Sequence, residues 1–172
     1  KDTTVESLAK LPTIFKKDGT ITAGSSSALC DAGSAVMVAD EEWAKAEGLA
    51  PIAEIVSYAV AAVDAEHFPI APVKAMNIAL SKAGMSIQDM ELIEINEAFA
   101  AQVIACHRKM PFDMDRLNVH GGAIALGHPI GASGTKILTT LIYSLKQQGK
   151  SIGLASACIG GGQGVAMIVK LI

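Results

Sequence analysis

Hydrophobic residues recur along this chain in two ways, as short apolar runs and as longer stretches with helical spacing. The short runs, rich in Val, Ile and Ala, predict strands over residues 35–39, 52–63, 92–95, 152–158 and 164–171. Apolar residues three and four apart predict helices over 41–47, 69–83, 98–110 and 129–148, with a short helical stretch over 4–10. Because strands alternate with helices, we expect an α/β fold in which helices cover both faces of a mixed sheet.

The composition of the chain excludes some classes of binding partner. Seventeen acidic and fourteen basic residues leave a net charge of −3, and only 18% of the 172 residues are charged, so we expect no nucleic-acid partner. The best candidate for a membrane span, residues 51–63, carries Glu54 and is shorter than the roughly 20 apolar residues that a spanning helix needs. We therefore expect no membrane span.

The cysteines and histidines indicate neither a disulfide framework nor a metal site. Three cysteines, Cys30, Cys106 and Cys158, are an odd number and lie far apart, which is typical of a protein in a reducing, intracellular compartment. No spacing between cysteines and histidines matches a metal-binding motif. We interpret Cys30 and Cys106 as packing residues.

Asn96 directly follows the predicted strand 92–95. Ligands of open α/β sheets collect beyond the carboxyl ends of strands, so Asn96 is placed to project into a site. An asparagine in this position is equally suited to capping the helix that follows. The sequence position alone leaves both roles open.

His128 lies in a glycine-rich segment, GGAIALGHPIGASG (121–134), at the start of the longest predicted helix. The positive end of the helix dipole disfavours imidazolium there, so a neutral imidazole is available as a base or hydrogen-bond donor near pH 7. The alternative is a glycine-rich packing helix with an incidental histidine. A phosphate-binding loop fits poorly, because Thr135 stands between the last glycine and the lysine.

Cys158 ends a predicted strand and precedes three glycines in CIGGGQG (158–164). The thiol and the unhindered backbone N–H groups of such a loop would together supply a thiolate and an oxyanion-binding nest. A single buried cysteine is more often a small hydrophobic residue, but the triple glycine favours a site.

Together, NEAFA (96–100), GGAIALGHPIGASG (121–134) and CIGGGQG (158–164) resemble, in order and spacing, the three C-terminal signatures of the thiolases. Thiolases form or cleave 3-ketoacyl-CoA by Claisen chemistry. The segment FKKDGTITAG (15–24) also resembles the family, so the similarity extends over nearly the whole chain.

The resemblance implies a role for each catalytic candidate. His128 would activate a nucleophilic cysteine and help bind the thioester oxygen of the second substrate. Cys158 would be the acid/base at the α-carbon, which requires a lowered thiol pKa that a neighbouring imidazole would provide. Asn96 would hold a water that completes one oxyanion hole with His128, and the backbone N–H of Gly160 would contribute to a second.

The same resemblance assigns five residues to the binding of substrate and CoA. Ser27 and Phe15 would line the channel for the pantetheine and adenine ends of CoA, and Phe68, Ala98 and Phe99 would line the substrate site. Phe68-Pro69 replaces a frequent Met-Gly pair, as in mitochondrial acetoacetyl-CoA thiolases that tolerate a 2-methyl branch. The CIGGGQG loop is closer to other branches of the family.

The family pattern also implies what lies outside this sequence. Thiolases run to about 400 residues, arranged as αβαβα layers, and their nucleophilic cysteine lies in an N-terminal half that none of the three cysteines here matches. We therefore expect residues 1–40 to be the end of that half and residues 41–172 the C-terminal domain. The chain would be inactive without a companion polypeptide carrying the N-terminal half.

Further expectations follow from the family. CoA and acyl-CoA would be substrates, with no cofactor, and the enzyme would be a homo-oligomer, either a dimer or a tetramer, in the mitochondrial matrix or the cytoplasm. The main alternative is a non-catalytic acyl-CoA-binding subunit, which would have no need of His128, Cys158 and Asn96 together. The related ketoacyl synthases carry a second His or an Asn where Cys158 stands, so Cys158 argues against them.

Overall fold

The computed structural model describes residues 2–172, so the first residue of the predicted segment 1–40 lies outside it. Four strands form one mixed sheet, in the order β1 (Ala53–Ala62), β4 (Gln163–Leu171), β3 (Ile152–Ile159) and β2 (Leu92–Ile95). β1 and β3 both pair antiparallel to β4, and β2 pairs parallel to β3. The predicted mixed sheet is confirmed.

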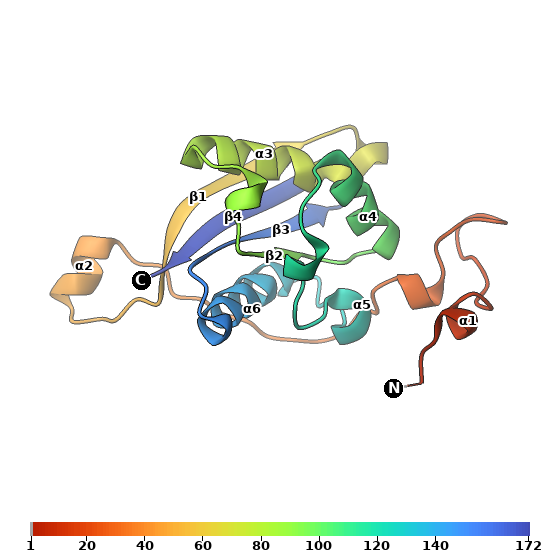
Figure 1. The fold of residues 1–172 in the computed structure, drawn as a ribbon, viewed down its shortest axis with the longest axis horizontal. Helices are drawn as coiled ribbons and strands as arrows, with labels where there is room; N and C mark the ends of the chain where they lie inside the picture. The colour runs from red at the N-terminus through yellow and green to blue at the C-terminus, as the bar shows by residue number, and fades with distance from the viewer. Residues whose placement is uncertain (1) are drawn as a thin grey trace.

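Helices cover both faces of this sheet, as the alternating pattern predicts (Figure 1). On one face, α3 (Ala71–Ala83) packs through Ala75, Met76, Ala79 and Leu80 against inward residues of the strands, with α4 (Ala100–Lys109) beside it. On the other face, α6 (Ser133–Gln148) packs through Ile137, Leu141, Ile142 and Leu145 against Leu92, Ala155, Ala157 and Val169. The sheet is thus the middle layer of three.

Several short elements connect these layers. They are α1 (Val5–Leu8), η1 (Ala23–Ser25), α2 (Glu41–Ala46), η2 (Ala65–Ile70), η3 (Ile87–Asp89), η4 (Met114–Arg116) and α5 (Ala123–Leu126). Among residues 2–172, no helix is long and apolar enough to cross a membrane. The short helix over 41–47 and the strands over 52–63, 92–95, 152–158 and 164–171 are found within one residue or so of their expected bounds.

The strand predicted over residues 35–39 is wrong for this structure, because the segment forms neither helix nor strand. Its apolar side chains are exposed, with Met37 at 73% and Val38 at 71%. An extended segment becomes a strand only when a neighbour pairs with its backbone, and no such neighbour lies beside it within residues 2–172. In Figure 1 the segment leads to α2, which stands apart from the sheet.

The longest helix begins at Ser133 rather than at residue 129. Residues 129–132 instead form a turn in which the Ala132 N–H donates to the carbonyl oxygen of Pro129 at 2.8 Å. This turn separates His128 from the helix axis and aims its ring back toward the strand ends. The difference in helix start therefore shapes the site.

Candidate active site

Asn96 and His128 meet beyond the carboxyl end of β2. Asn96 is only 2% exposed, and its backbone N–H donates to the carbonyl oxygen of Ser156 at 2.9 Å, which continues the parallel ladder with β3 by one residue. The ladder holds the Asn96 side chain so that Nδ2 lies 3.3 Å from Nε2 of His128. Two residues 32 positions apart in the sequence thus form one polar pair.

Ser133 orients the His128 ring from the other side. Its Oγ lies 2.6 Å from Nδ1 of His128 and donates to the carbonyl oxygen of Pro129 at 3.0 Å. Because a hydroxyl has one proton, Ser133 must accept the Nδ1 proton of the imidazole. The Nε2 lone pair then points toward the Asn96 amide, which donates to it.

Ser133 is a site residue that the sequence reasoning missed. The available signal was its place as the first residue of α6, five positions after His128, where a hydroxyl reaches back over the preceding turn. Ser133 is only 4% exposed, so water does not compete with its hydroxyl for the contact with His128.

His128 is held neutral. Partial burial lowers its pKa, and the positive charge of Lys136 lowers it further. Lys136 also donates to the carbonyl oxygen of Gly127 at 3.0 Å, directly before His128. A neutral imidazole whose Nε2 carries a lone pair and no proton is a competent general base.

We expect Lys136→Met to raise the pKa of His128, because it removes the nearby positive charge. The pKa is read from NMR titration of the imidazole. Lys136→Arg keeps the charge and should leave the pKa close to that of the wild type, and Lys146→Met, in the last turn of the same helix, serves as a second control. An unchanged pKa in Lys136→Met would contradict the electrostatic explanation.

Cys158 lies near the end of β3, opposite Gly164 of β4. Since side chains alternate along a strand, it shares the face of Leu154, which α3 covers, whereas Asn96 shares the face of Leu92, which α6 covers. Cys158 and Asn96 therefore approach the same end of the sheet from opposite faces. Within residues 2–172, no hydrogen bond joins the Cys158 thiol to His128.

The lowered thiol pKa expected for Cys158 is wrong for this structure, since burial raises it. Desolvation disfavours the thiolate, and no histidine among residues 2–172 hydrogen-bonds to the sulfur to offset it. The thiol is protonated at neutral pH and is a proton donor in this state.

The glycine loop after Cys158 forms the turn between β3 and β4. Gly161 and Gly162 have φ angles of 92° and 99°, a conformation that other residues rarely adopt. Gly160 is exposed and has open space where a Cβ would stand, so its backbone is accessible from outside.

Four of the five expected CoA and substrate residues lie together. Both the N–H and the hydroxyl of Ser27 donate to the carbonyl oxygen of Ala98 at 3.2 Å. The rings of Phe15 and Phe99 meet edge to face, with centroids 6.1 Å apart. One residue further along, the carbonyl oxygen of Ala28 accepts from the backbone N–H of His128 at 2.8 Å, so this strip borders the site.

Phe68 is not part of that strip. It is half-buried in η2, and its neighbours Pro69 and Ile70 line a cavity of about 300 Å³ together with Phe99. The cavity is largely apolar and reaches α4. Phe68 is thus next in sequence to two residues that share a cavity with Phe99.

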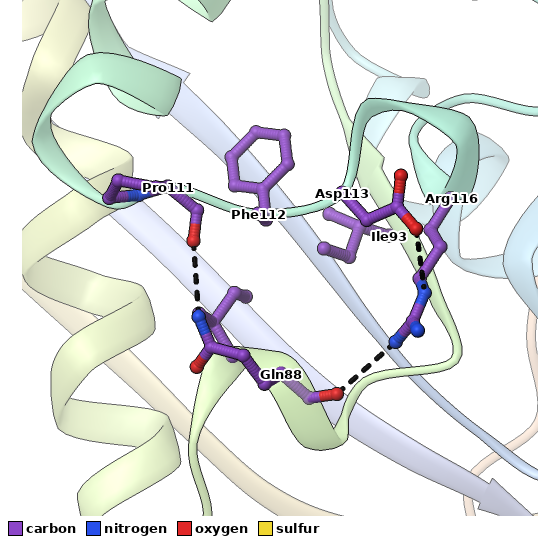
Figure 2. Close-up of a pocket in the computed structure, with 7 residues that line it drawn as sticks. Gln88, Ile93, Pro111, Phe112, Asp113 and Arg116 are labelled. Carbon is purple, nitrogen blue, oxygen red and sulfur yellow. Dashed lines mark hydrogen bonds and ion pairs between the residues drawn. The ribbon is translucent and has the colours of Figure 1, made fainter.

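A second cavity, of about 240 Å³, contains no residue of the three motifs (Figure 2). Its wall is held by Gln88, which donates to the carbonyl oxygen of Pro111 at 3.3 Å, and by Arg116, which pairs with Asp113 at 3.3 Å and donates to the Gln88 carbonyl oxygen at 3.2 Å. The polar groups of this wall therefore bind one another.

Glu94, in the middle of β2, is a buried carboxyl that the motifs do not explain. It is 3% exposed, and burial, with a smaller contribution from the negative charge of Glu97, raises its pKa to about 8 although Lys136 opposes the shift. The folded protein therefore keeps a proton on Glu94 that the unfolded chain loses above pH 4.5.

This proton makes stability fall as pH rises from about 4.5 to about 8, because the unfolded state binds fewer protons across that window. We expect Glu94→Gln, which is neutral and of the same shape, to remove this fall and to raise the melting temperature at pH 8 relative to the wild type. Thermal unfolding at pH 5 and pH 8 tests it, with the exposed Glu54→Gln as control. A wild-type dependence on pH in Glu94→Gln would refute the assignment.

The comparisons with known proteins agree with this α/β architecture. The family model described as thiolase, C-terminal domain, matches residues 49–171, and that described as thiolase, N-terminal domain, matches residues 1–42. The chain belongs to the thiolase family.

The similar proteins are considerably longer. The chain is 49% identical to human mitochondrial 3-ketoacyl-CoA thiolase over 98% of its own length, and 53% identical to acetyl-CoA acetyltransferase of Pseudomonas aeruginosa over 96%. It spans 42% of each of these relatives.

Solved structures of similar proteins have the same fold as this chain. Over 99% of the chain, the TM-score is 0.95 with acetyl-CoA acetyltransferase of Bacillus anthracis, at 47% identity, and 0.93 with human mitochondrial 3-ketoacyl-CoA thiolase in complex with CoA, at 45% identity. In each case the chain covers 43% of the solved chain. The expected thiolase fold is confirmed.

Proposed function

We propose that this chain forms the acid–base part of a thiolase, an acyltransferase of fatty acid metabolism that cleaves or forms acetoacetyl-CoA or another 3-ketoacyl-CoA. The observation that carries the proposal is the Asn96–His128–Ser133 arrangement, which leaves the Nε2 lone pair of a neutral histidine at the same end of the sheet as Cys158. The nucleophilic cysteine comes from the N-terminal half of the enzyme.

In the cleavage direction, His128 takes the proton of the companion's cysteine thiol, and the thiolate attacks carbon 3 of the substrate. The bond between carbons 2 and 3 breaks, and its electron pair forms the enolate of acetyl-CoA. Cys158, protonated because burial raises its pKa, gives its proton to carbon 2. The two groups therefore begin the reaction with the protonation states that this direction requires.

The second step returns both groups to their starting states. The CoA thiol attacks the acyl-enzyme thioester and loses its proton to the Cys158 thiolate, while imidazolium returns its proton to the leaving cysteine. While protonated, His128 presents Nε2–H as a donor to the substrate oxygen, together with a water held by Asn96. The N–H of Gly160 serves a second oxyanion hole.

The substrate groups would follow the strip of residues beside His128. Ser27 and Phe15 would contact the pantetheine and adenine ends of CoA, with Ala98 and Phe99 nearer the reacting carbons and Phe68 behind them. The edge-to-face pair of Phe15 and Phe99 and the contacts between Ser27 and Ala98 support this order. CoA and acyl-CoA are substrates here, and the proposal includes no cofactor.

The companion half would cover apolar surface that the chain leaves exposed. Within residues 2–172, the run around Met37 and Val38 pairs with no strand. Tyr58 and Val60 of β1 lie on the same sheet face as α6, but α6 does not reach them, and they are 61% and 66% exposed. The family-model matches support residues 1–40 as the end of the N-terminal half and residues 41–172 as the C-terminal domain.

Location and assembly belong to the same proposal. Relatives described as mitochondrial and relatives from bacteria support the mitochondrial matrix or the cytoplasm. The proposal keeps the homo-oligomer, a dimer or a tetramer, that the family resemblance implies.

Thiolysis of acetoacetyl-CoA by CoA tests the function. We expect turnover when the chain is supplied with its N-terminal half and none from the chain alone. CoA binding without turnover in the complete assembly would instead support a non-catalytic acyl-CoA-binding subunit.

A further inference from the structure

We propose that Glu97 is a positioning residue for His128, acting through a carboxylate that joins the end of β2 to the loop carrying the histidine. The inference rests on the proposed function, because it assigns Glu97 a part in orienting the base of that reaction.

Both oxygens of the Glu97 carboxylate have a donor. Oε1 accepts from Nδ2 of Asn118 at 3.0 Å, and Oε2 accepts from the backbone N–H of Ile124 at 3.1 Å. Ile124 lies in the first turn of α5, where backbone N–H groups have no partner within the helix. The carboxylate thus supplies an acceptor that the short helix lacks.

Asn118 cannot move away from this contact. Its Oδ1 accepts from the N–H of Ile95 at 2.9 Å, and its Nδ2 also donates to the Ile95 carbonyl oxygen at 2.9 Å. Its backbone N–H donates to Ile93 at 2.9 Å, and its φ is 45°. If the Asn118 amide were rotated to exchange its oxygen and nitrogen, its NH₂ group would face the N–H of Ile95 and its oxygen would face the carbonyl oxygen of Ile95.

A carboxylate is required at position 97 because both partners are donors. Glutamine has one oxygen and one NH₂ group, so it would satisfy one partner and place N–H against N–H at the other. Gly122 adds a steric limit, since a Cβ there would collide with the Glu97 carboxyl group. The pocket for this carboxylate therefore includes a residue without a side chain.

The Glu97 carboxylate affects His128 through residues 123–127, a short segment held by hydrogen bonds. The N–H of Gly127 donates to the carbonyl oxygen of Ala123 at 2.8 Å, which closes α5. His128 follows, between the Lys136 contact to Gly127 and the Asn96 contact to its ring. Asn96 contacts the His128 ring, and Glu97, the next residue, holds the loop that carries His128.

Glu97→Gln in the complete enzyme tests the proposal, with Glu91→Gln as the matched control. Glu91 likewise accepts two N–H groups through its carboxylate. Both come from the backbone, of Ser151 at 2.7 Å and Ile152 at 3.1 Å, and both go to Oε2, at the opposite end of β2. The readouts are hydrogen exchange of peptides covering 122–127, the ¹⁵N spectrum of the His128 imidazole, and kcat and KM for thiolysis.

We expect Glu97→Gln to speed exchange in 122–127, to populate the second imidazole tautomer of His128, and to lower kcat about 10- to 100-fold with little change in KM. Glu91→Gln should change none of these. A Glu97→Gln enzyme with the exchange, spectrum and kcat of Glu91→Gln would overturn the proposal.

Two further arms keep the test decisive. If Glu97→Gln fails to fold, Gly122→Ala displaces the same carboxylate from the Ile124 N–H and is judged by the same readouts. If the wild-type enzyme shows no thiolysis, the proposed function fails, whereas hydrogen exchange and the imidazole spectrum still decide whether Glu97 positions His128.

Discussion

Replacing His128 by Ala is expected to lower kcat for thiolysis by between about 10² and 10⁴-fold in the assembled enzyme, the range that a general acid–base group typically contributes. The loss follows from the geometry of the ring, since Nε2 carries the lone pair that accepts the nucleophile's proton, and Ser133 fixes that tautomer. Both acyl transfer and α-proton exchange should suffer, because the same nitrogen serves the thioester oxygen. Steady-state kinetics and burst amplitudes measure the two losses.

His107→Ala is the control for this experiment. His107 lies on α4, where its ring packs edge to face on Phe112 at 4.9 Å between centroids, away from the three motifs. Its removal should leave kcat near the wild-type value. Wild-type turnover in His128→Ala would show that the base lies elsewhere.

Replacing Cys158 by Ala should separate the two half-reactions. Without the thiol, exchange of the α-protons of acetyl-CoA with solvent should fall at least about 10²-fold. Formation of the acyl-enzyme from acetyl-CoA should continue within about threefold of the wild type, because His128 activates the companion's cysteine and CoA can leave as a thiolate without the proton that Cys158 would give it. Deuterium incorporation, followed by mass spectrometry, and trapping of the acyl-enzyme measure the two steps.

Cys106→Ala distinguishes loss of this particular thiol from loss of any buried thiol nearby. Cys106 is fully buried on α4, burial raises its pKa to about 11, and its sulfur contacts the Pro69 carbonyl oxygen. The variant should keep α-proton exchange. Undiminished exchange in Cys158→Ala would remove Cys158 from the role of acid/base.

The predictable part of the fold is the part in which each element buries its apolar side chains against another element of the same chain. β3 and β4 fit this description, and so do α3 and α6. The segment 35–39 has the composition of a strand, but within residues 2–172 no backbone pairs with it. The hydrophobic pattern of a segment indicates which element it tends to form, but it does not show whether a strand that would pair with it is present.

The three motifs located the site and include Glu97 and Ser133, but they indicated no role for these two residues. Asn96 and Cys158 stand at strand ends, and His128 and Cys158 lie near glycines, which are local signals. Ser133, Glu97 and Asn118 act through contacts that depend on where loops return, and polar residues in loops are common. The direction of the Cys158 pKa shift could not be read from sequence either, because it depends on how deeply the sheet buries the sulfur.

Asn118 also affects how this sheet meets other chains. β2 is an outer strand, and an outer strand with free N–H and C=O groups is a template for adding strands from another molecule. Here Asn118 occupies these groups, through its backbone at Ile93 and through its side-chain amide at Ile95. The sheet is therefore closed to further strands beside β2, and any strand that joins it must do so beside β1, at the opposite edge.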